Sequence, residues 1–426
     1  MINIISKFIA YGELGLPAVL VRQLSIAIGE DAKEKKERIR DLVFTCYWVL
    51  TLLGLAILWI LYLLGLPPRG TLGLSLIILL TATVLTERFV SYLLTNLKAE
   101  RRFDVIGKRQ IFAAVLGVVL VVPLTIWLGV EGALIASILA SVIQGAWLAR
   151  AMKMAYRLYF NLRMALSFLR LGFVLSLYRF EYHMVWTFQI MILVAMTDIR
   201  NVGLYSLALG AFTVMQIVPN AVARVLYPTI MVEKGKSDAK NTEYLRKYTG
   251  SMFTIYLLAS AVAAGGVFFL FDFFVHNVLV EFGESVSLLK WIVVGFVLWR
   301  AALFAHTILD AQGRFATLVI WNLLYNISAL ALTWLFIDLY GLVGVAMASF
   351  VANVVFGLVT LNLAMSRVHN SWLTSLQLAL RHTAAWGLTV GAFMGLAQLP
   401  DLFQRGQEVT AASVGVGIGT LFIQGV

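Results

Sequence analysis

The stretch GVEGALIASILASVIQG, residues 129–145, returns 212 positions later as GLVGVAMASFVANVVFG, residues 341–357. The same offset relates LKAERRF at 97–103 to LDAQGRF at 309–315. Chance matches between small residues are common in an apolar chain, but they do not also keep an Arg-Phe pair and a set of glycines in one register. The sequence therefore contains two related halves.

The composition is that of a polytopic membrane protein. Of the 426 residues, 61% are hydrophobic and 13% are charged, whereas soluble domains average about 45–50% apolar and about 25% charged residues. The net charge of +11 is carried by short loops between apolar segments, which is typical of cytoplasmic loops and does not indicate nucleic-acid binding. The single cysteine, Cys46, excludes an intrachain disulfide and a cysteine-based metal site.

Apolar segments of about 20 residues, the length that crosses a bilayer, occur about thirteen times along the chain. They lie at about 2–25, 41–65, 71–97, 109–128, 131–152, 168–196, 202–228, 249–276, 286–309, 315–337, 341–365, 375–398 and 410–426. The odd-numbered loops between them are rich in Lys and Arg, and the even-numbered loops are short and poor in both. The positive-inside rule therefore places the odd-numbered loops in the cytoplasm.

A second repeat implies that a helix precedes Met1. Pro17 and Arg22 in PAVLVR match Pro219 and Arg224 in PNAVAR at an offset of 202. The span at 168–196, which opens the second half, then has its counterpart upstream of the sequence. We therefore expect that a first helix of roughly 25–40 residues is missing before Met1. Six spans per half make both halves enter the membrane in the same sense, which predicts parallel repeats with a cavity between them.

We predict four segments from this pattern. They are an N-terminal helical bundle at 1–153, a connector at 154–167, a C-terminal helical bundle at 168–366 and two additional transmembrane helices at 367–426. Around the connector, Arg157, Arg163 and Arg170 alternate with aromatic and leucine side chains, which is typical of an amphipathic segment in the cytoplasmic interface. Either a hinge between the bundles or a contact with substrate fits this composition.

Arg88 and Arg300 are charged residues predicted to lie deep in the membrane. They share the 212 offset and precede a basic loop by nine or ten residues, about 14 Å along a helix. A charge at such depth costs at least about 2.5–3.5 kcal/mol, so it indicates a function. Guanidinium groups bind phosphate groups bidentately. We therefore predict that the two arginines face each other and bind a pyrophosphate; pairing of each with an acid is the structural alternative.

Other ionisable residues in the apolar spans are weaker candidates. Arg179 and His183 lie one helical turn apart on the same face, which suits an anion site or an interhelical ion pair. Arg22 and Arg224 are nearer the cytoplasmic ends, where a long side chain reaches the interface. Embedded carboxylates can carry a proton or bind a coupling cation, or can compensate the arginines. The carboxylates concerned are Glu13, Glu87, Glu181 and Asp272, of which Glu13 stands beside Gly12, Gly15 and Pro17.

The sequence does not indicate an enzyme. It contains no G-x-x-x-x-G-K-[ST] phosphate loop, no spacing of metal ligands and no loop between the spans long enough to fold as a catalytic domain. We therefore expect a transporter without cofactor or metal.

Three stretches resemble a known family. They are VGLYSLALGAFTVMQIVPNAVARVLYPTI at 202–230, ELGLPAVLVRQ at 13–23, and LDAQGRF followed by GLVGVAMAS. Together they resemble the polysaccharide-type (Wzx-like) flippases of the multidrug/oligosaccharidyl-lipid/polysaccharide exporter superfamily. The eighth helix of that family begins G-x-Y-S-x-A, contains a central proline and ends with a hydrophobic residue and proline. The matching residues here are Gly203, Tyr205, Ser206, Ala208, Pro219 and Pro228.

The resemblance implies an all-α membrane protein with two pseudo-symmetric six-helix bundles, often followed by two C-terminal helices. Such proteins move a polyprenyl-pyrophosphate-linked oligosaccharide across the cytoplasmic membrane through a cationic cavity, for O-antigen, capsule or exopolysaccharide synthesis. Membrane lipids, a polysaccharide polymerase and chain-length machinery are the expected partners. Against this resemblance, the counterpart of the family's first helix is expected before Met1, and Gln189 stands where relatives often have an acid in the seventh helix.

Three other functions stay open at this point. A drug/cation antiporter of the same superfamily predicts an acidic cavity with few arginines. A lipid II flippase uses the same cationic chemistry as an oligosaccharide flippase. A membrane enzyme of glycan assembly would need a catalytic loop outside the membrane.

Overall fold

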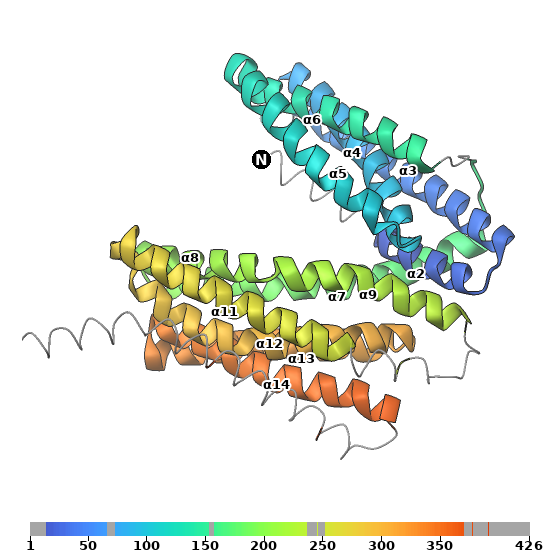
Figure 1. Ribbon diagram of the computed structural model, residues 1–426. Helices are drawn as coiled ribbons and strands as arrows, with labels where there is room; N and C mark the ends of the chain where they lie inside the picture. The colour runs from blue at the N-terminus through green and yellow to red at the C-terminus, as the bar shows by residue number, and fades with distance from the viewer. Residues whose placement is uncertain are drawn as a thin grey trace, which may run out of the picture. The chain divides into compact units, whose positions relative to one another are not determined.

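The computed structural model describes residues 14–65, 73–152, 157–236, 245, 252–369, 377 and 391, and the regular structure in these ranges is helical (Figure 1). The helices are α2 (Leu16–Gly29), α3 (Lys33–Leu63), α4 (Leu74–Ala99), α5 (Phe103–Leu116), the π turn η1 (Gly117–Val121), α6 (Val122–Met152), α7 (Leu162–Met196), α8 (Ile199–Met215), α9 (Ile217–Lys236), α11 (Phe253–Asn277), the 3₁₀ turn η3 (Val280–Phe282), α12 (Glu284–Ala311), α13 (Phe315–Tyr340) and α14 (Leu342–His369).

The predicted spans that fall on described residues coincide with these helices. Seven of the described helical segments are long and apolar enough to cross a membrane, or eight if α8 and α9 form one bent span. The segment predicted as one span at 202–228 is bent by 40° between Met215 and Ile217, and a single span there stays a prediction. Pro219 explains the bend, since it has no N–H to donate to the carbonyl of Met215. The predicted spans at 375–398 and 410–426 lie outside the described residues.

Backbone conformation confirms the sequence repeat. Gly129 and Gly341, which are 212 positions apart, both have φ of 59°, a left-handed value that glycine adopts without strain. Gly129 is non-helical, so it separates the span at 109–128 from the span at 131–152, as predicted. Arg101 and Gly313, again 212 positions apart, have φ of 59° and 76°. Equivalent chain reversals therefore occur at equivalent positions in the two halves.

The small residues of the repeat let helices pack closely. A Cβ at Gly132 would lie 1.8 Å from the carbonyl oxygen of Leu124, and a Cβ at Gly344 would lie 1.9 Å from that of Phe336. Leu124 and Phe336 are themselves 212 positions apart, so each half makes the same contact. Only glycine leaves room for it.

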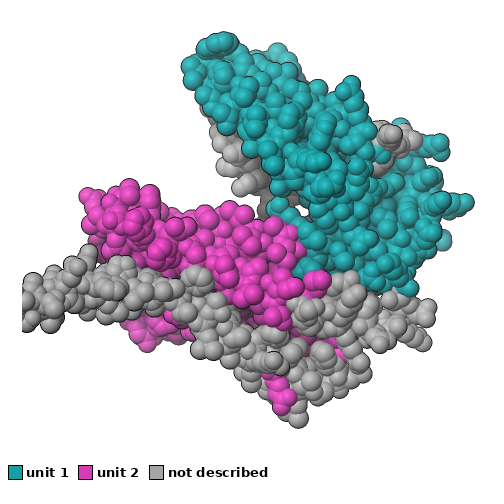
Figure 2. Space-filling model, in the orientation of Figure 1, with its two compact units in different colours: residues 1–182, 223–245, 309–320 teal, residues 183–222, 246–308, 321–426 magenta. Residues whose placement is uncertain are grey.

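The chain packs into two compact units, each made of segments that are not consecutive in sequence (Figure 2). Unit 1 contains residues 1–182, 223–245 and 309–320, and unit 2 contains residues 183–222, 246–308 and 321–426. Unit 1 thus includes, from the second half of the repeat, most of α7, the end of α9 and the turn between α12 and α13. These units are defined by packing, and the sequence-based bounds at 153 and 168 stay predictions.

The core of unit 1 surrounds α2. Leu16, Leu20 and Leu24 on this helix are almost completely buried, with α3 and α4 packed against it. The core of unit 2 surrounds α12, whose Phe296 and Trp299 rings contact the Phe212 ring of α8, with centroids 5.6 and 5.4 Å away. Each unit therefore has one central helix, and the buried residues of these helices include two arginines, Arg22 on α2 and Arg300 on α12.

Candidate functional site

Arg300 is a fully buried cation in unit 2. It lies on α12, and only 1% of its surface is exposed. Its Nη2 donates a hydrogen bond of 2.9 Å to Oδ1 of Asn220, which follows Pro219 near the start of α9. A buried guanidinium requires compensation, and one amide oxygen supplies only part of it.

Three aromatic rings supply further compensation. The Cζ atom of Arg300 lies 5.6 Å from the centroid of Tyr256, 5.8 Å from that of Phe296 and 5.6 Å from that of Trp299. Cations are attracted to aromatic faces at about this distance, by about 0.5–2 kcal/mol each. The rings and Asn220 therefore form an aromatic cage around the guanidinium, and we use that name below for these four residues.

The aromatic cage leaves part of the guanidinium unsatisfied. Nε and Nη1 of Arg300 are buried without a hydrogen-bond partner, and no ion pair joins Arg300 to a carboxylate in the part of the chain that the structure describes. Leaving charged donors unpaired is costly in a low dielectric. The structural alternative from the sequence, pairing of Arg300 with an acid, therefore finds no support among these residues. The N–H groups on these two nitrogens point to different sides of the guanidinium, so each can donate a charge-assisted hydrogen bond to a separate oxygen acceptor, such as an oxygen of a phosphate group.

Arg88, the repeat equivalent of Arg300, has different surroundings. It lies on α4 in unit 1 and is half-buried, and its neighbour Glu87 is exposed. The difference follows from the two helices, because α12 is enclosed in its unit whereas most of the apolar stretch of α4 is not. The two arginines belong to different units, so each is described by itself, and a joint pyrophosphate site stays a prediction.

Most other predicted site residues lie outside the described part. Glu13 precedes it. Arg179, Glu181 and His183 lie on α7, whose backbone is helical there, but their side chains are not among those described. Roles for these four residues in anion binding or ion coupling stay predictions.

Asp272 has a local partner. It lies in the last two turns of α11, where its Oδ1 is 3.3 Å from Nδ1 of His276, and its side chain is 23% exposed. The same His276 nitrogen is 2.9 Å from the backbone oxygen of Asp272. The Asp272 carboxylate therefore lies near the C-terminal end of α11, beside His276. A role in ion coupling stays a prediction.

Gln189 is the centre of a neutral polar network in unit 2. Its Nε2 donates to Oγ1 of Thr333 at 2.8 Å and to Oγ of Ser349 at 3.0 Å, and its Oε1 accepts from the Tyr205 hydroxyl at 3.3 Å. Gln189 is 1% exposed. An amide both donates and accepts here, a pattern that an ionised carboxylate could not make. The network therefore explains why an uncharged residue fits this position.

Arg22 and Asp310 form a buried ion pair in unit 1 that the sequence did not reveal. Nε of Arg22 donates to Oδ1 of Asp310 at 2.9 Å, and the two side chains are 8% and 5% exposed. The Tyr227 hydroxyl donates to Oδ2 of Asp310 at 2.7 Å, and Arg22 lies over the Phe315 ring at 5.2 Å. Snorkelling was the wrong interpretation for Arg22, because burial and pairing hold it inside. Its repeat equivalent Arg224 is exposed.

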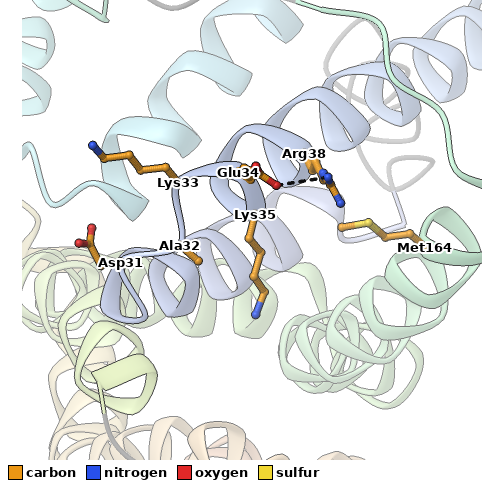
Figure 3. A pocket seen from close by; sticks show the side chains of 7 residues that line it. All are labelled: Asp31, Ala32, Lys33, Glu34, Lys35, Arg38 and Met164. Carbon is orange, nitrogen blue, oxygen red and sulfur yellow. Dashed lines mark hydrogen bonds and ion pairs between the residues drawn. The ribbon is translucent and has the colours of Figure 1, made fainter.

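A pocket of about 650 Å³ opens beside the start of α3 (Figure 3). Its lining residues are Asp31, Ala32, Lys33, Glu34, Lys35, Arg38 and Met164. Lys35 donates to Glu30 at 2.6 Å, and Arg38 donates to Glu34 at 3.3 Å. Lys35 and Arg38 of this pocket are thus paired with neighbouring acids. None of the predicted site residues lines the pocket.

Comparison with known proteins shows the fold. No family model and no curated protein matches the chain. Solved structures do: the Vibrio cholerae MATE transporter VcmN in the bent form has 19% identity and a TM-score of 0.69, covering 90% of this chain and 88% of that one. An outward-facing multidrug resistance MATE family transporter of the MOP superfamily has 17% identity and a TM-score of 0.70, covering 86% of each chain. The chain therefore has the MATE-like fold with two helical bundles.

Proposed function

We propose that this protein is an exporter of the cytoplasmic membrane that moves a polyprenyl-pyrophosphate-linked oligosaccharide between leaflets. The MATE-like fold supports transport, since the similar solved structures described above are transporters. The sequence resemblance to polysaccharide-type flippases supports the substrate class. The expected partners are the lipid-linked glycan, membrane lipids and the polymerase and chain-length machinery that lengthens the glycan.

The single observation that carries the substrate class is the state of Arg300. Its guanidinium is buried at 1% exposure, it has no carboxylate partner among the described residues, and two of its nitrogens lack hydrogen-bond partners. A cationic drug would be repelled by this charge, whereas a pyrophosphate would neutralise it. Charge-assisted hydrogen bonds of this kind contribute about 1.5–3 kcal/mol.

Burial of Arg300 limits how a phosphate can reach it. Because the aromatic cage encloses Arg300 in the present conformation, a phosphate reaches it only when helices of unit 2 rearrange. In the proposed cycle the pyrophosphate enters from the cytoplasmic side, Arg300 and Arg88 neutralise it, and the bundles rock while the polyprenyl tail stays in the lipid. The oligosaccharide then leaves on the opposite side. Alternating exposure of one site is the general mechanism of transporters built from repeats.

Replacement of Arg300 tests the anion site. We expect Arg300→Gln to weaken binding of a polyprenyl-pyrophosphate sugar to the purified protein by about tenfold to a hundredfold, because 1.4 kcal/mol corresponds to a factor of ten. Arg300→Lys keeps the charge but not the fork, and should weaken binding less. Binding is measured by microscale thermophoresis in detergent.

Arg200→Gln is the matched control for this test. Arg200 also belongs to unit 2 and pairs with Glu284 at 3.0 Å, but both side chains are more than half exposed. Exposed pairs of this kind contribute little, so binding should not change. Unaltered affinity in a folded Arg300→Gln variant would remove the basis for the anion site.

A drug antiporter is the second candidate. The observation in its favour is the fold, since one of the similar solved structures is titled as a multidrug resistance transporter. A proton-coupled antiporter needs an embedded carboxylate that titrates. The neutral network around Gln189 provides none at that position of unit 2. Among the embedded carboxylates predicted from the sequence, Glu87 and Asp272 lie on described residues.

A further inference from the structure

The buried pair of Arg22 and Asp310 connects the two halves of the repeat. Arg22 belongs to α2 of the first half, and Asp310 belongs to the end of α12 in the second half. Besides the bond to the carboxylate, Nη2 of Arg22 donates to the backbone oxygen of Asp310 at 3.2 Å. All these residues belong to unit 1. The pair therefore holds a piece of the second half against the core of the first.

Other contacts near the Arg22–Asp310 pair join residues of the same half of the repeat. In the first half, Oγ of Ser25 on α2 donates to the carbonyl of Ala99 at the end of α4, at 3.2 Å. In the second half, Lys234 on α9 donates to the carbonyl of Ala311, the repeat equivalent of Ala99. The α2–α4 and α9–α12 contacts are thus intrinsic to one half, whereas Arg22 crosses to the other.

The crossing contact has no symmetric copy. The repeat equivalent of Asp310 is Lys98, and that of Arg22 is Arg224. A reciprocal contact would bring two cations together, which is unfavourable, and Arg224 is in fact exposed. Asp310 therefore allows an ion pair between the halves at one position of the repeat, whereas Lys98 at the equivalent position does not allow one with Arg224.

Two glycines bring the backbones of α2 and α9 together beside this pair. A Cβ at Gly29 would lie 2.0 Å from the carbonyl oxygen of Val232, and a Cβ at Gly235 would lie 2.1 Å from that of Ile26. The helix ends that meet here precede basic loops, so the positive-inside rule places them at the cytoplasmic side. The contact closes tightly because no side chain separates the helices.

We propose that Arg22 and Asp310, with Tyr227 bound to the same carboxylate, form a cytoplasmic latch that holds the two halves together and opens once in each transport cycle. Closed, the ion pair is shielded from water and its oxygens are satisfied by Arg22 and Tyr227. In the open state, water hydrates each charge. A partly separated state would leave a buried charge without a partner or water, which is strongly unfavourable. This makes the latch a two-state element. The proposal rests on the proposed function only in requiring alternating access, and not in the identity of the substrate.

Accessibility of a cysteine tests the latch without any substrate. Val232 is 1% exposed and its carbonyl faces Gly29, so Val232→Cys in a Cys46→Ala background reports whether α2 and α9 are together. A membrane-impermeant maleimide is added to inverted vesicles. We expect labelling to be slow with the latch intact, and about tenfold faster in Arg22→Gln or Asp310→Asn, because either change removes the attraction that favours the closed state.

Two further variants keep the test decisive if a single change prevents folding. Arg22→Gln with Asp310→Asn leaves no lone buried charge, and should fold and label fast. Arg22→Asp with Asp310→Arg restores a pair of opposite sign, and should label more slowly than either single variant. Arg200→Gln with Glu284→Gln removes an exposed pair of similar length and should label like the parent.

The outcome separates this proposal from the proposed substrate. Arg300→Gln should leave labelling of the cysteine at 232 unchanged, since Arg300 lies in unit 2 and takes no part in the latch. Slow labelling in folded Arg22→Gln and in the double neutral variant would overturn the latch, whatever the substrate proves to be. Fast labelling in these variants supports it even if the anion-site test fails.

Discussion

Gln189 shows how a single residue constrains the chemistry of transport. Its amide satisfies three hydroxyl groups at once, those of Thr333, Ser349 and Tyr205. The hydroxyls of Thr333 and Ser349 also donate to carbonyls of their own helices, whereas the Tyr205 hydroxyl is bonded to the amide oxygen. A neutral, satisfied network of this kind stabilises the packing of unit 2 and carries no proton.

We predict that Gln189→Leu lowers the free energy of unfolding by about 1–3 kcal/mol, the cost of an unsatisfied buried polar group. Adding Tyr205→Phe removes the hydroxyl that lost its acceptor, and should recover part of this loss. Thermal unfolding of the purified protein in detergent measures both changes. A double variant that is less stable than the sum of the two single changes would contradict the assigned bond.

Arg22 and Arg300 show which site features the sequence could reveal. Depth in an apolar segment is readable from residue counts, and it predicted that Arg300 lies deep in the membrane, facing Arg88; the structure shows Arg300 buried inside unit 2. Partners are not readable, because Asp310 is 288 positions from Arg22 and Asn220 is 80 positions from Arg300. Arg22 was therefore interpreted as snorkelling, although a tertiary ion pair buries it.

Close backbone contacts fix both ends of α2. Gly15 at its start and Gly29 at its end each approach another backbone closely, since a Cβ at Gly15 would lie 2.2 Å from the carbonyl oxygen of Gly172 on α7. Leu16, Leu20 and Leu24 fill the core between these contacts. The described helix has 14 residues, fewer than the roughly 20 that cross a bilayer. Its contacts with other helices therefore determine its position.

Gly29→Ala tests the close approach of α2 and α9. The added methyl group would meet the carbonyl oxygen of Val232, so we expect unfolding to be easier by about 1–3 kcal/mol, as is typical of overpacking. Gly107→Ala on α5 is the control, because no atom outside its own helix backbone lies within 4 Å of the new methyl group. It should be neutral or stabilising by up to about 1 kcal/mol. Equal melting temperatures for the two variants would contradict the described crossing.

Helix positions could be predicted well from apolar length, but bends could not. The break after 128 was found because a glycine interrupts the apolar pattern. The 40° bend between α8 and α9 was missed because the segment from 202 to 228 is apolar enough on average to be taken as one span. Hydropathy is averaged over all residues of a span, whereas the bend results from a single residue, Pro219, which has no N–H group to donate within the helix.

At the scale of the whole molecule, the repeat was the most informative feature of the sequence. The 212 offset reappears in the φ angles of Gly129 and Gly341 and in the contacts of Gly132 and Gly344. Register alone therefore predicted which helices are equivalent. It did not predict that compact unit 1 takes in the segments 223–245 and 309–320, because contacts between the halves, such as the latch, break the symmetry.

Transport by the reconstituted protein tests the central claim most directly. Proteoliposomes would contain either a fluorescent polyprenyl-pyrophosphate oligosaccharide or a cationic dye with an imposed proton gradient, and movement of each would be followed with a membrane-impermeant quencher or by dye release. The account predicts movement of the anionic lipid-linked sugar, loss of that movement in Arg300→Gln, and no export of the dye. Export of the dye by a protein that leaves the lipid-linked sugar in its original leaflet would contradict it.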